Sequence, residues 1–525
     1  MSPDKIQNSF LKKMNRIFYY IINSLCCLIY RKRYHRFMAT SDIESVQQNK
    51  LKEILRHNRQ SQYGIEHNFD RIKTIQDFQK EVPLTTYEDY MEYIERIKSG
   101  EKNILTTEDV LLFEPTSGTT TGSKYIPYTA SLKKEFQVGI QPWIYNLYQS
   151  VPAIKWGKSY WSITPATHQK LYTDGGIPIG FEEDSEYFGK IERYLMNRIF
   201  ATDSSIAKEK DMDQFYLKTA VSLLMCTNLT LISVWNPSYL LILTEYIYKN
   251  RKRLLEIIPA KIAAKIRQPL ENRAFGDIWK KLVIISCWTD ASAQPQADVL
   301  KAAFPKVRIL PKGLLATECF ATIPLIGHEG AALSIFSHFF EFENTADGKI
   351  CLAHQLKQNA EYALIVTTGG GFYRYRMNDV VRVTGYTRNR IPLLRFIGRA
   401  GNVSDLHGEK ISELFLKKCM EKLTFRPEFY MFAPEADKYV LYIKTNNILP
   451  DMDNLLKENF HYDYCRKLGQ LKKLEIFKLT GHAEKEYIDY CTKSGQRIGD
   501  IKTTLLSRKG GWDKVFTGYY EKDIV

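Results

Sequence analysis

The chain has 525 residues, 44% of them hydrophobic and 13% aromatic, which is enough for one large domain with a smaller appendage. With 19 prolines and no low-complexity tract, its composition excludes a disordered scaffold. The net charge is +15, but eight basic residues lie in the first 38 against a single acid, Asp4. This uneven distribution argues against a nucleic-acid-binding protein with a broad basic surface.

The first predicted element is the apolar run 17–30, which has basic residues on both sides. The run is too short to span a bilayer, and the basic residues after it argue against a cleaved signal peptide. We expect residues 1–38 to form a helix that packs on the body, with peripheral membrane contact through residues 12–36 as the alternative. The nine cysteines are scattered without a C-x-x-C pair, which favours a reducing, cytoplasmic location.

Two helices are expected next, one over residues 42–56 and one that opens at Val82 and runs through Ile97. From Val110 onward, short apolar runs alternate with helical segments. The runs expected to be strands are 110–113, 161–164, 229–235, 282–288, 307–310 and 363–368. This alternation predicts an α/β domain with helices and mostly parallel sheets, in which ligands collect at the strand ends.

A boundary is expected between Gly398 and Gly408, where small and turn-forming residues are concentrated. We therefore predict a large N-terminal domain over residues 39–400 and a smaller, mobile α+β lid domain over residues 401–525.

Residues 114–129 join two predicted strands through a loop rich in hydroxyl groups and glycine. Such a loop suits polyphosphate oxygens, although its spacing is not that of a Walker loop and a strand follows it instead of a helix. The alternative is a surface turn. The candidate phosphate ligands are Thr116, Ser117, Gly118, Thr119 and Thr120.

Two further segments place polar side chains beside predicted strands. Thr317 and Glu318 follow the run 307–310, and Glu318 could bind Mg²⁺ together with phosphate oxygens. The alternative there is a helix cap. Asp379 lies between two predicted strands and could bind a ribose diol, unless Asn378 and Asp379 form only a hairpin turn.

In this order, the three segments resemble the auxin-responsive acyl acid amido synthetase family of plants and bacteria. That family is a branch of the adenylate-forming superfamily, with acyl-CoA synthetases and luciferases. The resemblance covers nearly the whole chain, and the further segments that carry it are Tyr63-Gly64, 82–84, 87–90, 176–180 and 395–399.

The resemblance implies an ATP- and Mg²⁺-dependent ligase that forms an acyl-adenylate and passes the acyl group to an amino acid. We expect the protein to be a monomer. By the same resemblance, residues 116–120 would hold the ATP phosphates, Thr317 the α-phosphate, Glu318 the Mg²⁺ and Asp379 the ribose. Three basic residues would assist: Arg399 at the nucleotide, Lys410 just past the hinge, and Lys502 as the catalytic lysine of the mobile domain.

The chain departs from the family pattern at four positions, which are Leu314, Asn378, Asp290 and Asp500. Leu314 stands where an aromatic ring is common, Asn378 and Asp290 where glycine is common, and Asp500 adds a carboxylate two residues before Lys502. Two alternative functions remain open. One is an acyl-CoA ligase, and the other is a catalytically degenerate protein that binds nucleotide or acid.

Overall fold

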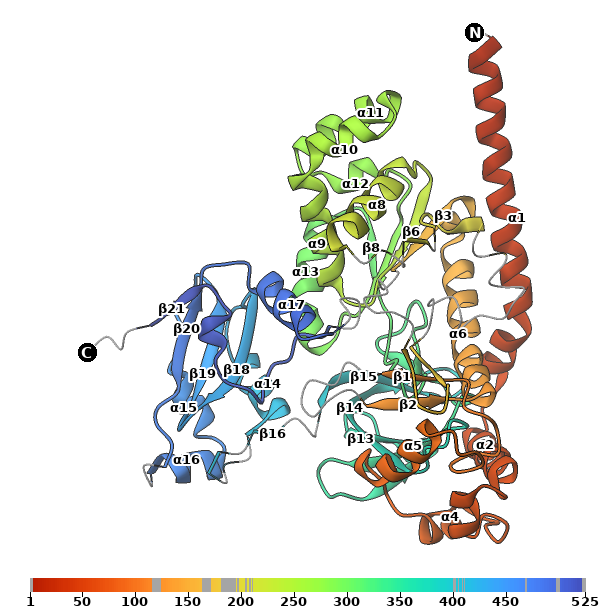
Figure 1. Cartoon of the computed structure of the whole chain (residues 1–525), viewed down its shortest axis with the longest axis vertical. Coiled ribbons are helices and arrows are strands. Elements are labelled where there is room, and N and C mark those ends of the chain that lie inside the picture. Colours follow the sequence, from red (N-terminus) through yellow and green to blue (C-terminus); the bar gives the residue numbers. More distant parts are fainter. Residues whose placement is uncertain are drawn as a thin grey trace.

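The computed structural model describes residues 3–115, 124–162, 171–180, 195, 198–203, 205–206, 209, 211–399, 403–404, 406–407, 409, 411–467, 470–496 and 501–521. Helices and sheets form a large α/β part, and a smaller part of helices and strands follows it at the C-terminal end (Figure 1). The predicted fold class is confirmed.

The front end of the chain is helical, as expected. Its helices are α1 (Pro3–Ala39), α2 (Ile43–Asn58), α3 (Gln62–Glu66), α4 (Ile75–Glu81) and α5 (Met91–Lys98). Asp42 caps α2, because its side chain accepts a hydrogen bond from the Ser45 N–H group.

One predicted boundary in this region is wrong. The helix expected to open at Val82 begins only at the 3₁₀ turn η1 (Glu88–Tyr90). Val82 precedes a proline and is extended, with ψ 120°. Thr85 then pairs with β14 (Tyr375–Tyr386), since its N–H group donates to Arg374 O at 3.0 Å and its carbonyl accepts from Arg376 N at 2.8 Å.

The front-end helices hold the segment that leads into β14. The Tyr63 ring stacks on the Tyr373 ring with centroids 4.9 Å apart, and Tyr90 Oη donates to Tyr373 O at 2.8 Å. Gly64 is required at this point because a Cβ atom there would lie 2.1 Å from Asn58 O. The start of β14, and with it Asp379, therefore depends on the front end.

A four-stranded sheet with strand order β3-β6-β7-β8 is parallel throughout. Its strands are β3 (Lys158–Trp161), β6 (Leu229–Ser233), β7 (Ile284–Cys287) and β8 (Arg308–Pro311). The helices of this half are α6 (Ala130–Ser150), α8 (Met212–Met225), α9 (Pro237–Lys249), α10 (Arg251–Ile257), α11 (Ala260–Glu271), α12 (Phe275–Ile278) and α13 (Gln294–Ala303). Every residue of β6 and β7 is buried, as expected for central parallel strands.

The largest sheet has seven antiparallel strands in the order β12-β11-β13-β14-β15-β10-β9. Besides β14 it contains β9 (Thr322–Ile323), β10 (Ala331–Leu333), β11 (Phe339–Asn344), β12 (Ile350–Leu352), β13 (Glu361–Thr367) and β15 (Pro392–Arg399). A smaller mixed sheet, β2-β1-β5-β4, contains β1 (Leu112–Pro115), β2 (Tyr125–Tyr128), β4 (Leu171–Tyr172) and β5 (Pro178–Ile179). The parallel pairing expected from the sequence is thus concentrated between β3 and β8.

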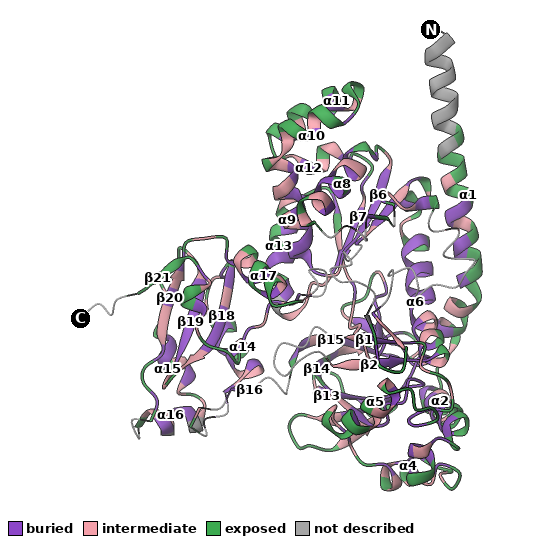
Figure 2. Ribbon diagram, viewed as in Figure 1, coloured by how far each residue is buried: buried purple, intermediate pink, exposed green. Residues whose placement is uncertain are grey.

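The C-terminal part contains a second mixed sheet, β18-β19-β20-β21, in which β19 is mostly buried and β20 only partly (Figure 2). Its elements are β16 (Val403–Ser404), β17 (Ile411–Ser412), α14 (Glu413–Glu421), β18 (Phe429–Glu435), β19 (Lys438–Lys444), α15 (Met452–Leu456), α16 (Phe460–Lys467), β20 (Glu475–Leu479), α17 (Ala483–Lys493) and β21 (Gly518–Tyr520). Asn236 Nδ2 donates to Ile501 O at 3.0 Å, and Arg426 pairs with Asp298 at 2.8 Å. These contacts join the C-terminal part to α9 and α13; the domain limits and the mobility of the lid stay predictions.

Glu484 on α17 should make the stability of this junction depend on pH. Burial raises the pKa of its half-buried carboxyl from 4.5 to about 7, although a hydrogen bond with Gln296 on α13 opposes the rise. The folded chain therefore holds a proton there that the unfolded chain releases, so the free energy of unfolding falls as the pH rises from 4.5 towards 7. We expect Glu484→Gln to stabilise the protein by about 1–3 kcal/mol at pH 8 and to change little at pH 4.

Denaturant unfolding of both proteins at the two pH values measures this difference. Glu421→Gln, on an exposed side chain of α14, is the matched control and should leave stability unchanged at both. A Glu484→Gln variant that is less stable than the parent protein at pH 8 would contradict the assignment.

Candidate adenylation site

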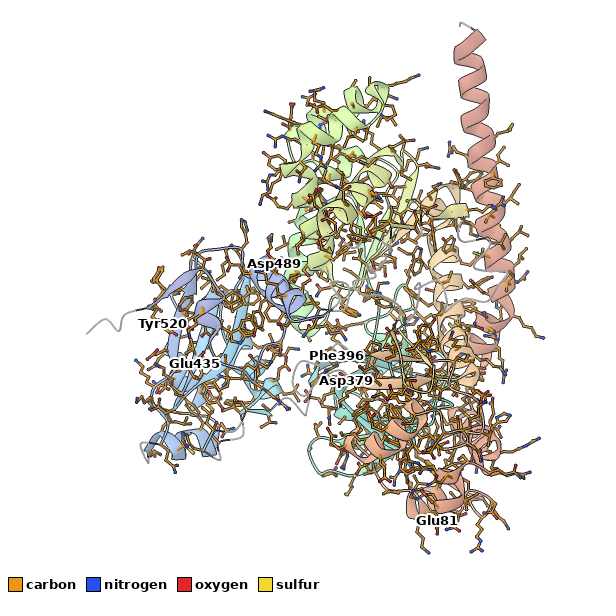
Figure 3. The ribbon with its side chains drawn as sticks, viewed as in Figure 1. Glu81, Asp379, Phe396, Glu435, Asp489 and Tyr520 are labelled. Carbon is orange, nitrogen blue, oxygen red and sulfur yellow. The ribbon has the colours of Figure 1, made fainter. Side chains whose placement is uncertain are left out.

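Asp379 and Arg399 face each other across two neighbouring strands. They are register partners on β14 and β15, and Arg399 Nε lies 3.0 Å from Asp379 Oδ1. Asp379 is buried, whereas half of the Arg399 side chain is exposed. Figure 3 shows Asp379 at the edge of the large part that faces the C-terminal part. A buried carboxylate oriented by a partly exposed arginine can present an oxygen to hydroxyl groups of a ligand.

Thr317 and Glu318 form the tip of a tight turn after β8, closed by a bridge between Leu315 and Phe320. Within the turn, Ala316 N donates to Cys319 O. The helix-cap alternative is wrong, because Thr317 and Glu318 lie in a turn and no helix begins there. Two neighbouring strands hold this turn. Tyr128 Oη on β2 donates to Thr317 O at 2.6 Å, and Cys319 Sγ lies 3.3 Å from Met377 Sδ on β14.

Strands β1 and β2 form an antiparallel hairpin, in the register Pro115↔Tyr125, which confirms the strand-loop-strand arrangement. The loop itself lies outside the described residues, so the roles of Thr116, Ser117, Gly118, Thr119 and Thr120 stay predictions. Because β2 also carries Tyr128, the hairpin is tied to the Thr317–Glu318 turn. The three sequence segments therefore meet in one region.

Charges from all three segments act on the Glu318 carboxyl. Burial raises the pKa of Glu318 above its ordinary value and Asp379 adds to the rise, whereas Arg399 and Lys124 oppose it. Lys124 ends the hairpin loop, just before β2. Two carboxylates and two cations thus lie within electrostatic range of one another, which is typical of sites that bind charged ligands.

The residues present fit a Mg²⁺ ion that arrives with a nucleotide. Over the described ranges, no group of three or more His, Cys, Asp and Glu side chains is arranged to hold a metal ion. Mg²⁺ is commonly bound through one or two carboxylates together with phosphate oxygens and water. Glu318 would supply the carboxylate in such a shell.

Lys502 lies beside the carboxyl end of the parallel sheet. Its Nζ is 4.5 Å from the centroid of the Trp288 ring, just after β7, and its carbonyl accepts a hydrogen bond from Tyr487 Oη at 3.2 Å. The C-terminal part therefore brings a lysine next to the large part. Lys410 and Asp500 lie outside the described residues.

Three family models match successive parts of the chain. The N-terminal domain of the GH3 family matches residues 33–274, the central domain residues 331–399, and the C-terminal domain residues 416–510. The chain belongs to the GH3 family. The resemblance stated from the sequence is confirmed.

Relatives of this GH3 chain include two plant enzymes. It is 24% identical over 470 residues to indole-3-acetic acid-amido synthetase GH3.2 of Arabidopsis thaliana, covering 78% of this chain and 83% of that protein. It is 22% identical over 437 residues to indole-3-acetic acid-amido synthetase GH3.8 of Oryza sativa subsp. indica, covering 73% and 71%.

Among solved structures, the AtGH3.15 acyl acid amido synthetase in complex with 2,4-DB is similar to this GH3 chain. Its TM-score is 0.79 at 19% identity, and the match covers 96% of this chain and 98% of that one. A 2-hydroxyisobutyryl-CoA ligase in the postadenylation state matches with a TM-score of 0.50 at 10% identity, covering 88% and 89%. The chain therefore has the fold that these two proteins share.

A buried lysine that was not predicted from the sequence, Lys312, lies in a cluster of tryptophans. Lys312 directly follows β8, is 4% exposed, and donates to Ser233 Oγ at 2.7 Å. Its Nζ lies 5.1, 5.4 and 4.4 Å from the ring centroids of Trp143, Trp161 and Trp235. Part of the signal was present in the sequence, because Trp235 ends the predicted strand 229–235 and Lys312 follows the predicted strand 307–310, and ligands collect at such strand ends. Trp161 was instead predicted to begin the strand 161–164, whereas it is the last residue of β3.

The same aromatic cluster reaches the catalytic-lysine candidate. Trp235 and Trp288 have ring centroids 5.9 Å apart, and Lys502 Nζ lies over the Trp288 ring. Contacts through Trp235 and Trp288 therefore connect Lys312 to Lys502.

Two of the departures from the family pattern have local structural roles. Leu314 packs against the main core, and its N–H group donates to Thr322 Oγ1 at 2.7 Å. Burial raises the pKa of Asp290, while Arg395 and Lys417 oppose the rise and the Phe396 backbone donates a hydrogen bond to it. Asp290 thus fastens the connection after β7 to β15 at Phe396, which lies close to Asp379 in Figure 3.

Asn378 can adopt the backbone conformation of a position where the family commonly has glycine. Its φ is +62°, in the left-handed region that asparagine tolerates better than most side chains. We expect Asn378→Gly to change stability little, and Asn378→Ala to lower the free energy of unfolding by about 1–2 kcal/mol. Chemical denaturation of the two variants measures both effects. Equal stability of the alanine variant and the parent protein would contradict this account.

Proposed function

We propose that this GH3 protein adenylates a carboxylic acid and transfers its acyl group to an amino acid. In the first step the carboxylate oxygen attacks the α-phosphorus of ATP, and pyrophosphate leaves. In the second step the amine nitrogen attacks the acyl carbon, so that an amide forms and AMP and a proton are released. The observation that carries the proposal is the convergence of the Thr317–Glu318 turn, the β1–β2 hairpin and the Asp379–Arg399 pair.

Each residue of the site has a role that suits its chemistry. Asp379 would accept hydrogen bonds from the ribose hydroxyls, with Arg399 orienting it. Thr317 would bind the α-phosphate, Glu318 the Mg²⁺, and the hydroxyl and backbone N–H groups of residues 116–120 the remaining phosphates. Lys502 and Lys410 would neutralise charge that develops on the phosphoryl oxygens. No protein nucleophile is needed in either step.

We further propose that the acid carries an aromatic ring. Trp161 and Trp235 beside Lys312 are only partly buried, and aromatic rings favour offset or edge contacts with another ring. The printed names of the relatives point the same way, since two refer to indole-3-acetic acid and one structure contains 2,4-DB.

Product analysis tests the function directly. Purified protein would receive Mg²⁺-ATP and a panel of aryl and aliphatic acids, with amino acids in one reaction and coenzyme A in another. We expect acyl amino acids, AMP and pyrophosphate in the first reaction, and no thioester in the second. Thioester alone would support an acyl-CoA ligase, and ATP binding without any acyl product would support a nucleotide-binding protein.

We also propose that the enzyme acts as a monomer, because one chain supplies every group assigned above. Light scattering of the purified protein tests this. Contact of residues 12–36 with a membrane would not depend on this function, because these residues belong to α1 and none of them is assigned to the adenylation site.

A further inference from the structure

One face of α1 is fixed against the body of the protein. Cys27, Tyr30 and Phe37 belong to the main buried core, and α1 runs alongside α6 (Figure 1). Asn23 Nδ2 donates to Lys155 O at 3.0 Å and to Gly157 O at 3.2 Å. The rotation of the helix about its axis is therefore set, and so is the face that it turns to solvent.

The solvent face of α1 is apolar over several turns. We call the following residues the outer face, with their exposed fractions: Met14 51%, Ile17 44%, Phe18 43%, Ile21 51%, Leu25 45%, Leu28 60% and Ile29 43%. Their spacing of three and four residues puts them on one side of the helix. From Met14 to Leu28 this stripe is about 21 Å long. Contiguous exposed apolar surface of this kind marks an interaction site.

The charge around the outer face is of one sign. Lys32 follows Leu28 by four residues and continues the same face, and Arg31 beside it is also exposed. Lys12 and Lys13 precede the stripe in the chain, whereas Arg16 turns to the body, with its guanidinium carbon 5.7 Å from the centroid of the Trp156 ring. The sequence contains no acidic residue between Asp4 and Asp42. An apolar stripe with basic residues at both ends is the pattern of helices that lie in the interface of an anionic membrane.

We propose that the outer face of α1 docks on an anionic lipid bilayer, with the helix axis parallel to the membrane plane. In the part of the chain that the structure describes, no helix has both the length and the hydropathy to cross a bilayer. Pairing with a second copy is disfavoured because two such helices, in either orientation, would bring only like charges together. The lipid phosphates would instead face Arg31 and Lys32 while the apolar side chains enter the acyl boundary.

Vesicle flotation of the full-length protein tests the proposal. We expect binding to phosphatidylcholine vesicles that contain about one quarter phosphatidylglycerol, and weak binding to pure phosphatidylcholine. The double variant Leu25→Asp/Leu28→Asp should lose binding. Lys32→Glu should weaken it by a factor of about five or more and reduce its sensitivity to salt. All substituted side chains are exposed, so thermal unfolding should match that of the parent protein.

The matched control is Ile448→Asp, which places the same change on a 94% exposed isoleucine of the C-terminal part and should leave binding intact. Failure of the parent protein to bind anionic vesicles would overturn the proposal, as would equal binding by Leu25→Asp/Leu28→Asp. Light scattering gives the third decisive outcome: a dimer that Leu25→Asp/Leu28→Asp dissociates would assign the outer face to a second copy instead.

Discussion

Replacing Glu318 with alanine is expected to lower acid-dependent pyrophosphate release by about 100-fold or more. Glu318 is the carboxylate that would bind Mg²⁺ beside the phosphates, and Asp379 and Arg399 already interact with each other. Without the Glu318 carboxylate the metal would lose its protein ligand. Negative charge on the phosphoryl oxygens and on departing pyrophosphate would then be less well compensated. Glu318→Gln should behave similarly, because a neutral amide oxygen is a weaker ligand for Mg²⁺.

The variant should still fold. Glu318 is at the tip of a turn whose fixed contacts are made by Thr317 O and the Cys319 side chain, and neither is changed. Thermal unfolding of Glu318→Ala checks this, and Glu421→Ala serves as an exposed control of the same charge change. Parent-level pyrophosphate release by a folded Glu318→Ala protein would refute the metal role.

Lys502→Ala is expected to slow the adenylation step by about 100-fold while sparing the second step. The positive charge of Lys502 would act on the phosphates, and those leave as pyrophosphate before the amine attacks. Supplying a synthetic acyl-adenylate and an amino acid isolates the second step, and its rate should change only a few-fold. Lys502→Arg should retain part of the adenylation activity because it keeps the charge.

Lys472→Ala, on an exposed lysine of the C-terminal part, is the control for loss of one charge. An equal loss in both half-reactions would show that Lys502 acts by holding the C-terminal part on Trp288 rather than through the phosphates. The asymmetry between the two steps is therefore the informative result.

Strand positions and local turns were predictable from the sequence because they depend on neighbouring residues. The runs 229–235, 282–288 and 307–310 contain β6, β7 and the start of β8, since buried parallel strands are nearly continuous apolar runs. Asp379 was expected between two strands, whereas it lies within β14, so the hairpin-turn alternative is wrong as well. Asn378 has a left-handed conformation inside this strand. The helix start predicted at Val82 was wrong because Thr85 pairs with Tyr375, and that pairing joins residues far apart in the chain.

Contacts between distant segments were not predictable. The bond from Tyr128 Oη to Thr317 O and the pairing of Asp379 with Arg399 depend on which strands become neighbours in the sheets. The tryptophans that surround Lys312 come from α6, β3 and the residues after β6, so no single stretch of sequence contains the whole cluster. Exposure of the outer face of α1 likewise required knowing which side packs on α6.

Acid-dependent exchange of radiolabelled pyrophosphate into ATP is the most direct test of the central claim, because it reports reversible formation of an acyl-adenylate. We predict exchange that requires both Mg²⁺ and a carboxylic acid, proceeds without any amine, and is lost in Glu318→Ala. Binding of ATP with no exchange across a broad panel of aryl and aliphatic acids would contradict adenylation by this site.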